Sequence, residues 1–427
     1  MKILVIGGGG REHAIVAALK KSAENPEIHA APGNAGIALL ASCHAVKATD
    51  VGAVVALAGE IKPEWVFVAP DDPLILGAVD ALNAAGFKTF GPRKSAAAIE
   101  GSKKFSKNFM SRHNIPTAAY ETFTDADKAV GYIKAAGAFP AVIKCDGPAL
   151  GKGVIIAQNL AEAEEAVDSI MRGGKFGESG REIVVEEYLD GVEVTVLAFT
   201  DGETLRALPA CTDHKRAFDG DKGPNTGGMG VIAPVPYYTD DVAAECTENI
   251  FIPTIRGLAS EGRAFKGCIY FGLMLTASGA KVVEYNCRFG DPEAQTLLPL
   301  LETDLLDITR AVWEGRLSET DVRFSPRKAA CVVMASGGYP EKYETGFGIT
   351  GLDEAEKMSG VYVFHAGTRS GGGGFVTAGG RVLCVTAVGD DAETALNKAY
   401  DALGKIDFSN KHYRRDRGKK AALFRTL

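Results

Sequence analysis

Near the N-terminus, short continuous apolar runs alternate with segments in which apolar residues recur at helical spacing. Lys2 to Ile6 is almost wholly apolar, and apolar residues recur on one helix face between Glu12 and Lys20. The same order returns as a helix at 51–60, a strand at 65–68, a helix up to 85 and a strand at 88–90. Such alternation is typical of a parallel sheet covered by helices. The pattern predicts a parallel α/β domain over residues 1–102.

A glycine loop, Gly7 to Gly10, joins the first strand to the first helix. Free N–H groups at a helix start, next to a loop without side chains, form an anion site. The dinucleotide-binding motif is not met, because no register supplies its third glycine and no acidic residue ends the next strand. We predict one phosphate at this loop, with a plain strand–helix turn as the alternative. The turn from Ala69 to Leu74 is expected at the same sheet edge.

The next segment, residues 103–122, carries Lys103, Lys104 and Lys107 on a predicted helix that ends near Asn114. A basic helix start is often only a solvated face, and this stays the alternative to a ligand role.

A strand-rich module follows. Its predicted strands are at residues 141–144, 154–157 and 182–189, and its predicted helix is at 160–171. The glycine loop from Cys145 to Gly153 is not a P-loop, since its spacing differs and a strand follows it. We interpret it as a hairpin lid. Lysines at both ends of this hairpin suit a polyphosphate, while Glu186 and Glu193 suit an adenine amino group and a ribose diol.

An apolar run from Cys268 to Thr276, a Ser278-Gly279 turn and the segment from Lys281 predict a further hairpin. Alternation places Glu284, Asn286 and Arg288 on one face. A carboxylate and an amide oxygen suit a hard cation such as Mg²⁺, and a guanidinium suits an anion beside it. The alternative is the polar outer face of a half-buried strand.

The middle of the chain combines a segment with cationic side chains and a segment rich in glycine. A predicted strand from Leu205 to Cys211 leads into Asp213 to Arg216, and glycines crowd positions 227–230. This combination suits a sugar phosphate, with a disordered polar loop as the alternative.

The last part of the chain has predicted helices at 299–314 and 392–403, and strands at 329–334, 361–365 and 381–386. The run Gly371 to Gly374 lies between short strands, so it is interpreted as a hairpin turn instead of a phosphate loop.

Composition narrows the class of protein. The net charge of -7 argues against a general nucleic-acid or anionic-membrane binder. Eight cysteines occur without Cys-x-x-Cys spacing, which favours a reduced, cytoplasmic protein over a disulfide scaffold or zinc site. The 51 glycines gather at strand ends, as expected of loops that approach a ligand closely.

These motifs, in this order, resemble the ATP-grasp superfamily, and within it most closely the glycinamide ribonucleotide synthetase family. The most specific segments are Asn286 to Glu293, Asp213 to Arg216 and Pro224 to Gly230. The resemblance implies an N-terminal parallel α/β (pre-ATP-grasp) domain, an ATP-grasp core of two α+β subdomains and a small C-terminal mixed α/β domain. The implied divisions are 1–102, a connecting helical segment 103–122, a lid 123–192, a large subdomain 193–325 and a C-terminal domain 326–427.

The resemblance also implies a reaction: ATP, glycine and 5-phosphoribosylamine give glycinamide ribonucleotide, ADP and phosphate through glycyl phosphate. Residues implied to bind ATP are Lys103, Lys144, Gly147, Gly151, Lys152, Gly153, Glu186, Glu187, Tyr188, Leu189 and Glu193. Those implied to bind the other substrates are Gly8, Gly9, Gly10, Asp72, Pro73, Leu74, Asp213, His214, Lys215, Arg216, Thr226, Gly227, Gly228, Met229, Gly230, Arg288, Gly290 and Asp291. Glu284 and Asn286 are implied to hold Mg²⁺ or Mn²⁺, while Arg288, Lys144 and Lys103 act in catalysis.

The chain departs from the family pattern at Cys145 and Pro148, where small residues are usual. Pro148 is expected to stiffen the lid loop without removing a charged ligand. Another ATP-grasp carboxylate–amine ligase or carboxylase-type enzyme, or a non-catalytic nucleotide-binding regulator, remains an alternative. A monomer in the cytoplasm is expected.

Overall fold

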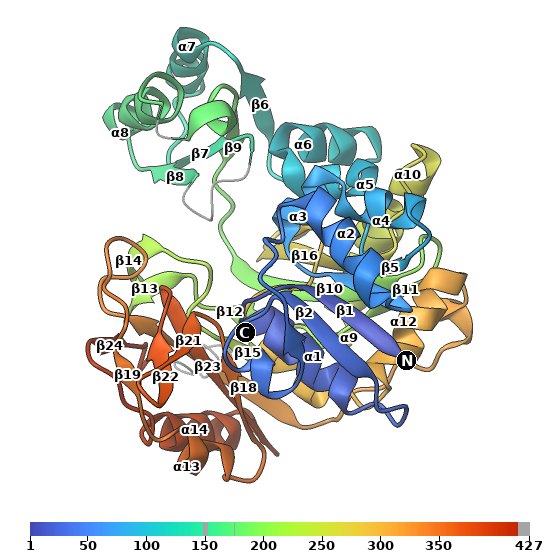
Figure 1. The fold of residues 1–427 in the computed structure, drawn as a ribbon. Coiled ribbons are helices and arrows are strands. Elements are labelled where there is room, and N and C mark those ends of the chain that lie inside the picture. The colour runs from blue at the N-terminus through green and yellow to red at the C-terminus, as the bar shows by residue number, and fades with distance from the viewer. Residues whose placement is uncertain (148–152, 175, 417–427) are drawn as a thin grey trace.

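The computed structural model describes residues 1–147, 153–174 and 176–416 (Figure 1). Its N-terminal sheet is parallel in the order β3-β2-β1-β4-β5, which confirms the predicted parallel α/β domain. The strands are β1 Lys2–Gly7, β2 Glu27–Pro32, β3 Ser42–Cys43, β4 Trp65–Val68 and β5 Lys88–Phe90. The helices are α1 Gly10–Lys20, α2 Val51–Ile61, α3 Asp71–Leu76, α4 Ala78–Ala84 and α5 Lys94–Gly101. The predicted turn before Leu74 is thus partly helical, as α3 begins at Asp71.

A small lobe stands above the body of the molecule (Figure 1). Its antiparallel sheet has the order β6-β9-β7-β8. These strands and two covering helices are β6 Tyr120–Phe123, β7 Ala141–Cys145, β8 Val154–Ala157, β9 Ile183–Glu187, α7 Ala126–Ala136 and α8 Leu160–Val167. The helix predicted to reach Met171 leaves α geometry after Val167 and widens into a π-helical turn, Asp168–Arg172. This lobe has its own apolar core.

The large sheet, in the order β11-β10-β16-β17, carries the predicted hairpin as β16 and β17. Its strands and nearby helices are β10 Val192–Thr200, β11 Leu205–Ala207, β16 Gly267–Thr276, β17 Gly279–Asn286, α6 Lys103–Arg112, α9 Asp240–Cys246 and α10 Ile252–Ser260. The strand predicted from Leu205 to Cys211 is wrong beyond Ala207, since Pro209 has no N–H for the ladder. Cys211 pairs with Thr195 only as an isolated bridge.

The C-terminal sheet takes two strands from the middle of the chain. Its order is β12-β15-β18-β23-β20, with β24 beside β18. The elements are β12 Thr212–Asp213, β15 Val231–Ala233, β18 Lys328–Ser336, β20 Val361–His365, β23 Arg381–Gly389, β24 Lys411–His412, α13 Leu352–Glu356 and α14 Ala392–Leu403. The segment between β12 and β15 is therefore anchored at both ends to this sheet.

Small hairpins complete the fold: β13 Arg216–Phe218 with β14 Lys222–Asn225, and β19 Gly348–Ile349 with β22 Gly374–Thr377 and β21 Thr368–Gly371. Gly372 and Gly373 have φ of 61° and 79°, so the predicted glycine turn is confirmed.

Two further helices, α11 Glu293–Leu297 and α12 Leu305–Glu314, follow the hairpin β16–β17. The helix predicted to start at Pro299 is wrong before Leu305. Leu301 is extended, and the Asp304 carboxylate caps α12 by accepting the Leu306 N–H at 2.8 Å.

An aromatic cluster fixes the N-terminal domain against the large sheet. Phe67 and Phe90 stack at 5.0 Å between ring centres, and Phe90 also meets Phe199 and Phe289. Burying each ring contributes about 1.5–3 kcal/mol, with about 0.5–1.5 kcal/mol more for each favourable ring pair. The loop after β17 is therefore held beside the glycine loop of β1.

Candidate functional site

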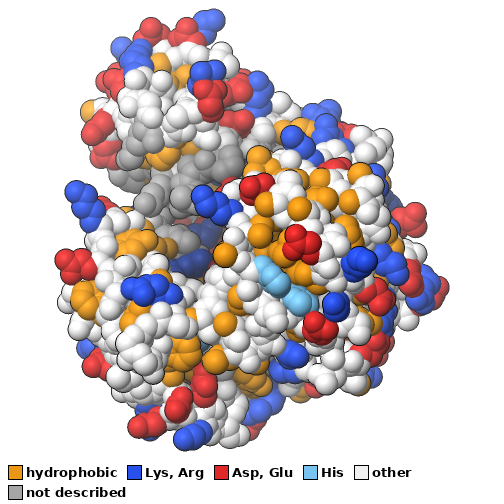
Figure 2. All heavy atoms as spheres, viewed as in Figure 1, with side chains coloured by type: hydrophobic (Ala, Val, Ile, Leu, Met, Phe, Trp, Pro, Cys, Tyr) orange, Lys and Arg blue, Asp and Glu red, His pale blue; other side chains and the backbone are white. Residues whose placement is uncertain are grey.

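A hollow separates the small lobe from the body, and Lys and Arg side chains line part of it (Figure 2). Three buried charged side chains from different elements form a cluster at the junction of the small lobe and helix α6. Lys144 of β7 and Lys107 of α6 both place their Nζ atoms within 3.0 Å of the Glu186 carboxylate of β9. All three residues are at least 95% buried. The structure therefore brings Lys144 and Glu186 together as an ion pair, and adds Lys107.

Lys103 begins helix α6 beside the lid loop. Ser102 caps this helix by accepting the Phe105 N–H at 3.0 Å, and its hydroxyl donates to Asp146. Lys103 Nζ donates to the Gly147 carbonyl at 3.3 Å. A side chain on Gly147 would collide with Ser179, so the loop needs glycine there.

The remaining lid residues are only partly described. The Gly153 carbonyl accepts the Cys145 N–H at 2.9 Å. Pro148, Gly151 and Lys152 lie outside the described residues, so their predicted roles stay predictions.

The hinge after β9 turns its side chains in different directions. Glu187 accepts the Ala119 N–H at 3.0 Å and pairs with Lys281 at 3.1 Å. Tyr188 and Glu193 are exposed, and Leu189 is half-buried. Within this group, Glu186 makes direct ion pairs with the buried lysines.

The strand β17 presents Glu284 and Asn286 on one face. Lys215 Nζ lies 3.5 Å from Glu284 and 3.7 Å from Glu193. The neighbouring Lys215 charge holds the pKa of Glu284 below its usual range, so this carboxylate is ionised at neutral pH. Lys144 Nζ reaches the same strand through the Val283 carbonyl at 3.3 Å.

The donor set of β17 fits a magnesium-type cation. Glu284 and Asn286 supply oxygen ligands, and no cluster of three or more His, Cys, Asp or Glu suited to a metal occurs among the described residues. Mg²⁺ is usually held by one or two carboxylates together with phosphates and water. These two residues therefore suit a cation whose other ligands come from a nucleotide.

Arg288 lies beyond the end of β17, so strand alternation does not fix its direction, although its charge still helps to lower the pKa of Glu284. Its guanidinium pairs with Glu100 at 2.9 Å and donates to the Phe289 carbonyl at 3.3 Å. Within the described residues its Nε is buried without a hydrogen-bond partner. One N–H of the guanidinium therefore has no acceptor among the described residues.

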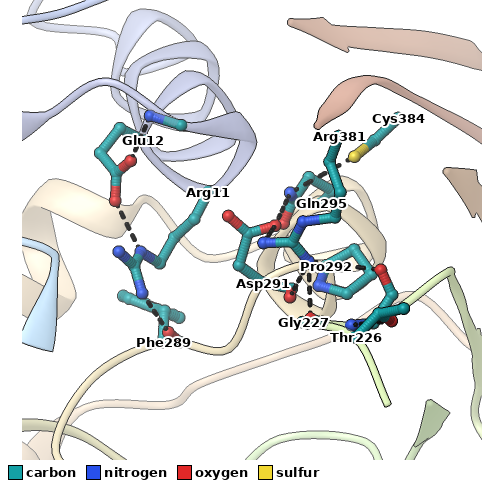
Figure 3. A network of polar contacts seen from close by, with 12 residues as sticks. Arg11, Glu12, Thr226, Gly227, Phe289, Asp291, Pro292, Gln295, Arg381 and Cys384 are labelled. Atoms are coloured by element: carbon teal, nitrogen blue, oxygen red, sulfur yellow. Dashed lines mark hydrogen bonds and ion pairs between the residues drawn. The ribbon is translucent and has the colours of Figure 1, made fainter. Parts of the chain in front are cut away.

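Three glycine-rich segments meet around Asp291 (Figure 3). Arg381 of β23 donates to the Gly227 carbonyl at 2.6 Å, to the Asp291 carbonyl at 2.6 Å, and pairs with the Asp291 carboxylate at 3.2 Å. The Gly9 Cα lies close enough that a β-carbon there would meet Asp291 at 3.4 Å. The structure thus brings together the predicted loops at 8–10, 227–230 and 290–291.

In the loop at residues 8–10, one backbone N–H is already hydrogen-bonded within the protein. Glu12 accepts the Gly9 N–H at 2.5 Å and pairs with Arg11 at 2.6 Å (Figure 3). Arg11 in turn donates to the Phe289 carbonyl at 3.2 Å. The loop is tied to the segment after β17, and fewer free N–H groups face a phosphate than the sequence indicated.

The side chains of residues 213–216 point in different directions and contact different parts of the protein. Lys215 points to β17, as described above, whereas His214 is buried with its Nδ1 3.2 Å from the Gly230 carbonyl. Arg216 donates to the Gly223 carbonyl at 2.8 Å within its own hairpin. Asp213 lies against Gly228, where a β-carbon would sit within 2.9 Å of both its carboxylate oxygens.

Other predicted substrate residues are buried by packing. Thr226 donates to the Lys215 carbonyl at 2.8 Å, and Met229 is fully buried. Pro73 and Leu74 are also buried, Leu74 in the core formed with α4 and α5. Asp72 beside them is exposed. The structure does not bring Leu74 to the surface of the site.

Sequence reasoning missed four residues of this region: Lys107, Glu100, Glu293 and Arg381. Glu100 and Arg381 lie far along the chain from the residues they hold, and no local pattern marks them. Lys107 was noted on a basic helix for which a solvated face was kept as the alternative, and no role was predicted for it. Glu293 closes the segment Asn286 to Glu293, so its place in that motif was a usable signal.

Glu293 is 97% buried, and burial together with Asp213 raises its pKa to about 7. Between pH about 4.5 and about 7 the folded protein therefore binds more protons at this group than the unfolded chain, and stability falls as pH rises. The change Glu293→Gln should raise the free energy of unfolding at pH 8 by up to about 3 kcal/mol and leave it nearly unchanged at pH 4.5. Urea unfolding at both pH values measures this difference.

The exposed Glu302→Gln variant is the matched control and should follow the parent protein at both pH values. A Glu293→Gln variant with the parent's pH dependence would show that this carboxyl is not strained by burial. A gain in stability with a loss of activity would mark a group kept for function.

Two α+β subdomains, one with buried Lys144 and Glu186 on its sheet and the other with Glu284 and Asn286 on β17, form the arrangement of an ATP-grasp enzyme. Family models match the Phosphoribosylglycinamide synthetase N domain at residues 1–100, its ATP-grasp (A) domain at 101–294 and its C domain at 329–420. The chain belongs to the phosphoribosylglycinamide synthetase family.

Similar proteins span the whole chain. It is 46% identical to a phosphoribosylamine–glycine ligase of Vibrio cholerae, covering 99% of this chain and 98% of that one. A Rhodopirellula baltica protein of the same name is 47% identical over 98% and 97%. The crystal structure of the Thermotoga maritima phosphoribosylamine–glycine ligase has a TM-score of 0.84 at 33% identity, covering 97% and 100%.

A biotin carboxylase of Campylobacter jejuni shares the fold at 14% identity, with a TM-score of 0.74 over 96% of this chain and 92% of that one. In the described part of the chain, every helix is too short or too polar to cross a membrane.

Proposed function

We propose that this chain joins glycine to 5-phosphoribosylamine in de novo purine biosynthesis. ATP is converted to ADP and phosphate, and the product is glycinamide ribonucleotide. The observation that carries the proposal is that relatives named phosphoribosylamine–glycine ligase match almost the full length of the chain. It is supported by the contact at 3.5 Å between Lys215 of the 213–216 segment and Glu284 of β17.

The chemistry requires activation of a carboxylate, which is a poor electrophile because oxide is a poor leaving group. Transfer of the γ-phosphoryl group to glycine gives glycyl phosphate, and the ribosylamine nitrogen then displaces phosphate. The protein's contribution is positioning and charge neutralisation at the transferring group. No general base is assigned.

The charged residues divide this work. Lys103 and Lys144, with Lys152, offset the phosphate charges, and Arg288 uses its free N–H to hold the glycine carboxylate or acyl phosphate. Glu284 and Asn286 would hold Mg²⁺ or Mn²⁺, which when bound supplies positive charge at the ATP phosphates. Glu186, Glu193 and the 187–189 hinge position the adenosine.

The sugar phosphate is assigned to the ring of loops around Asp291. The segments proposed to bind it are Gly8 to Gly10, Asp213 to Arg216, and Thr226 to Gly230, of which the glycine segments lie close to Asp291 and Arg381. Closure of the lobe over the hollow would keep water from the acyl phosphate. A monomeric, cytoplasmic enzyme is part of the proposal.

The test is phosphate release by the purified full chain with Mg-ATP, glycine and freshly generated phosphoribosylamine. Release should require all three substrates, and mass spectrometry should detect glycinamide ribonucleotide. Release that is independent of glycine or of the amine contradicts the proposal and favours another ATP-grasp reaction.

A further inference from the structure

Lys107 is a buried cation in the middle of helix α6. Its side chain is 3% exposed, and its Nζ lies 3.0 Å from Glu186 and 2.8 Å from the Thr117 hydroxyl. It also lies over the Tyr120 ring, 5.6 Å from the ring centre. A lysine kept so far from water needs a compensating role, because burying an ammonium group is unfavourable.

The contacts of Lys107 connect the small lobe to the metal strand. Glu186 belongs to the lobe sheet, whereas the Thr117 hydroxyl, which accepts from Lys107, donates to the Val282 carbonyl of β17 at 2.7 Å. The Val282 N–H also donates to the Pro116 carbonyl at 2.8 Å. Val282 stands two residues before Glu284. A continuous chain of polar contacts thus runs from the lobe to the strand that carries Glu284.

The buried charges of this cluster do not balance. Lys107 and Lys144 share the single carboxylate of Glu186, and both ammonium groups are nearly inaccessible to water. The next acidic group, Glu187, is engaged by Lys281 and the Ala119 N–H. Burial lowers the pKa of Lys107 to about 8, opposed by Glu186 and reinforced by Lys144. The three buried side chains thus carry two positive charges and one negative charge, while Glu187 and Glu284 act on them from more exposed positions.

We propose that Lys107 is a positioning residue that fixes Lys144 and the lobe against the metal strand, and that a bound nucleotide phosphate supplies a further negative charge. The inference rests on the proposed ATP site, but it concerns nucleotide binding alone. The groups that face Lys107 are Glu186 and Glu187 of β9, Lys144 of β7, Tyr120 of β6 and Thr117 of the preceding loop. The other cations of its own helix are Lys103, Lys104 and Arg112, the last of which pairs with Glu261.

Nucleotide binding is expected to be coupled to protonation of Lys107. An anion beside the cluster favours the charged form of Lys107 and raises its pKa. At pH 8–9 a fraction of the protein must therefore take up a proton when the nucleotide binds, and affinity must fall as pH rises through this range. A rise of one pH unit in the pKa corresponds to a tenfold preference of the nucleotide for the protonated protein.

The experiment is calorimetric titration of the full chain with Mg-ADP between pH 7 and 9.5, in buffers of different ionisation enthalpy. The parent protein should take up protons near pH 8–9 and lose about tenfold in affinity towards pH 9.5. Lys107→Met should bind Mg-ADP about tenfold more weakly at pH 7 and show no proton uptake near pH 8–9. Lys107→Arg keeps the charge at every pH, so it should retain affinity better and also show no uptake.

The matched control is Lys104→Met, which removes the same charge from the same helix at a side chain that is 41% exposed and paired with Glu182. It should keep the parent's proton uptake. A parent protein that takes up no proton near pH 8–9 overturns the proposal without any variant. Uptake that survives in Lys107→Met also overturns it, even where thermal stability falls, because the lysine is then only structural.

These outcomes are separate from those of the ligase assay. A parent protein that binds Mg-ADP with proton uptake but forms no glycinamide ribonucleotide contradicts the proposed reaction and leaves the role of Lys107 standing. A protein that forms the product without linked proton uptake keeps the reaction and loses this role.

Discussion

The change Glu284→Ala is expected to lower metal-dependent phosphate release by about 100- to 1,000-fold, the usual range when one group that stabilises transition-state charge is removed. Glu284 is an ionised carboxylate on β17 that pairs with Lys215, and the Val283 carbonyl beside it already accepts from Lys144. No neighbouring carboxylate of this strand can replace it. Initial rates over a Mg²⁺ titration, with ATP, glycine and phosphoribosylamine saturating, measure the effect.

Two further variants sharpen this result. Glu284→Gln keeps an oxygen donor but loses the charge, so its rate should lie between those of the parent protein and Glu284→Ala and should rise with excess Mg²⁺. Glu245→Ala is the matched control, because Glu245 caps the turn end of the same hairpin by accepting the Ala280 N–H. It should stay within about twofold of the parent rate, as is usual for changes remote from the chemistry. A Glu284→Ala variant with the parent's rate and metal dependence would remove the metal assignment.

The sequence predicted the bounds of those helices and strands in which apolar residues recur with one regular spacing from end to end. The helix α14 and the strand β20 have the predicted bounds, and the hairpin β16–β17 lies where alternating residues and a Ser-Gly turn placed it. The predicted bounds were wrong where an apolar run continued past a residue that ends or caps the element. Asp304 starts α12 five residues after Pro299, and Pro209 ends the pairing of β11.

The charged site was harder to predict, because its balance depends on contacts between distant segments. Glu100 meets Arg288, and Arg381 meets Gly227 and Asp291, across separations of 188, 154 and 90 residues. A sequence can show that Lys107 is cationic, but only the packing of α6 against β9 shows that it is buried beside Glu186. Site residue types were therefore predictable, while their partners and directions were not.

The change Arg288→Met should lower kcat/KM for glycine by about 100-fold or more, the loss typical of removing one preorganised donor from the reacting centre. The same change leaves Glu100 buried without its cation, which costs about 3–5 kcal/mol of stability. Arg288→Lys should be nearly as inactive, because an ammonium group cannot pair with Glu100 and present a second, rigidly oriented N–H to a substrate.

The double variant Arg288→Met with Glu100→Gln separates these two effects. Removing both charges restores most of the thermal stability, since no uncompensated buried carboxylate remains. It does not restore the guanidinium Nε–H, which the protein itself leaves without a partner among the described residues. Steady-state kinetics with varied glycine, together with thermal unfolding, should therefore show recovered stability and unrecovered kcat/KM. Recovery of both would reduce Arg288 to a structural partner of Glu100 and remove it from the acyl-group site.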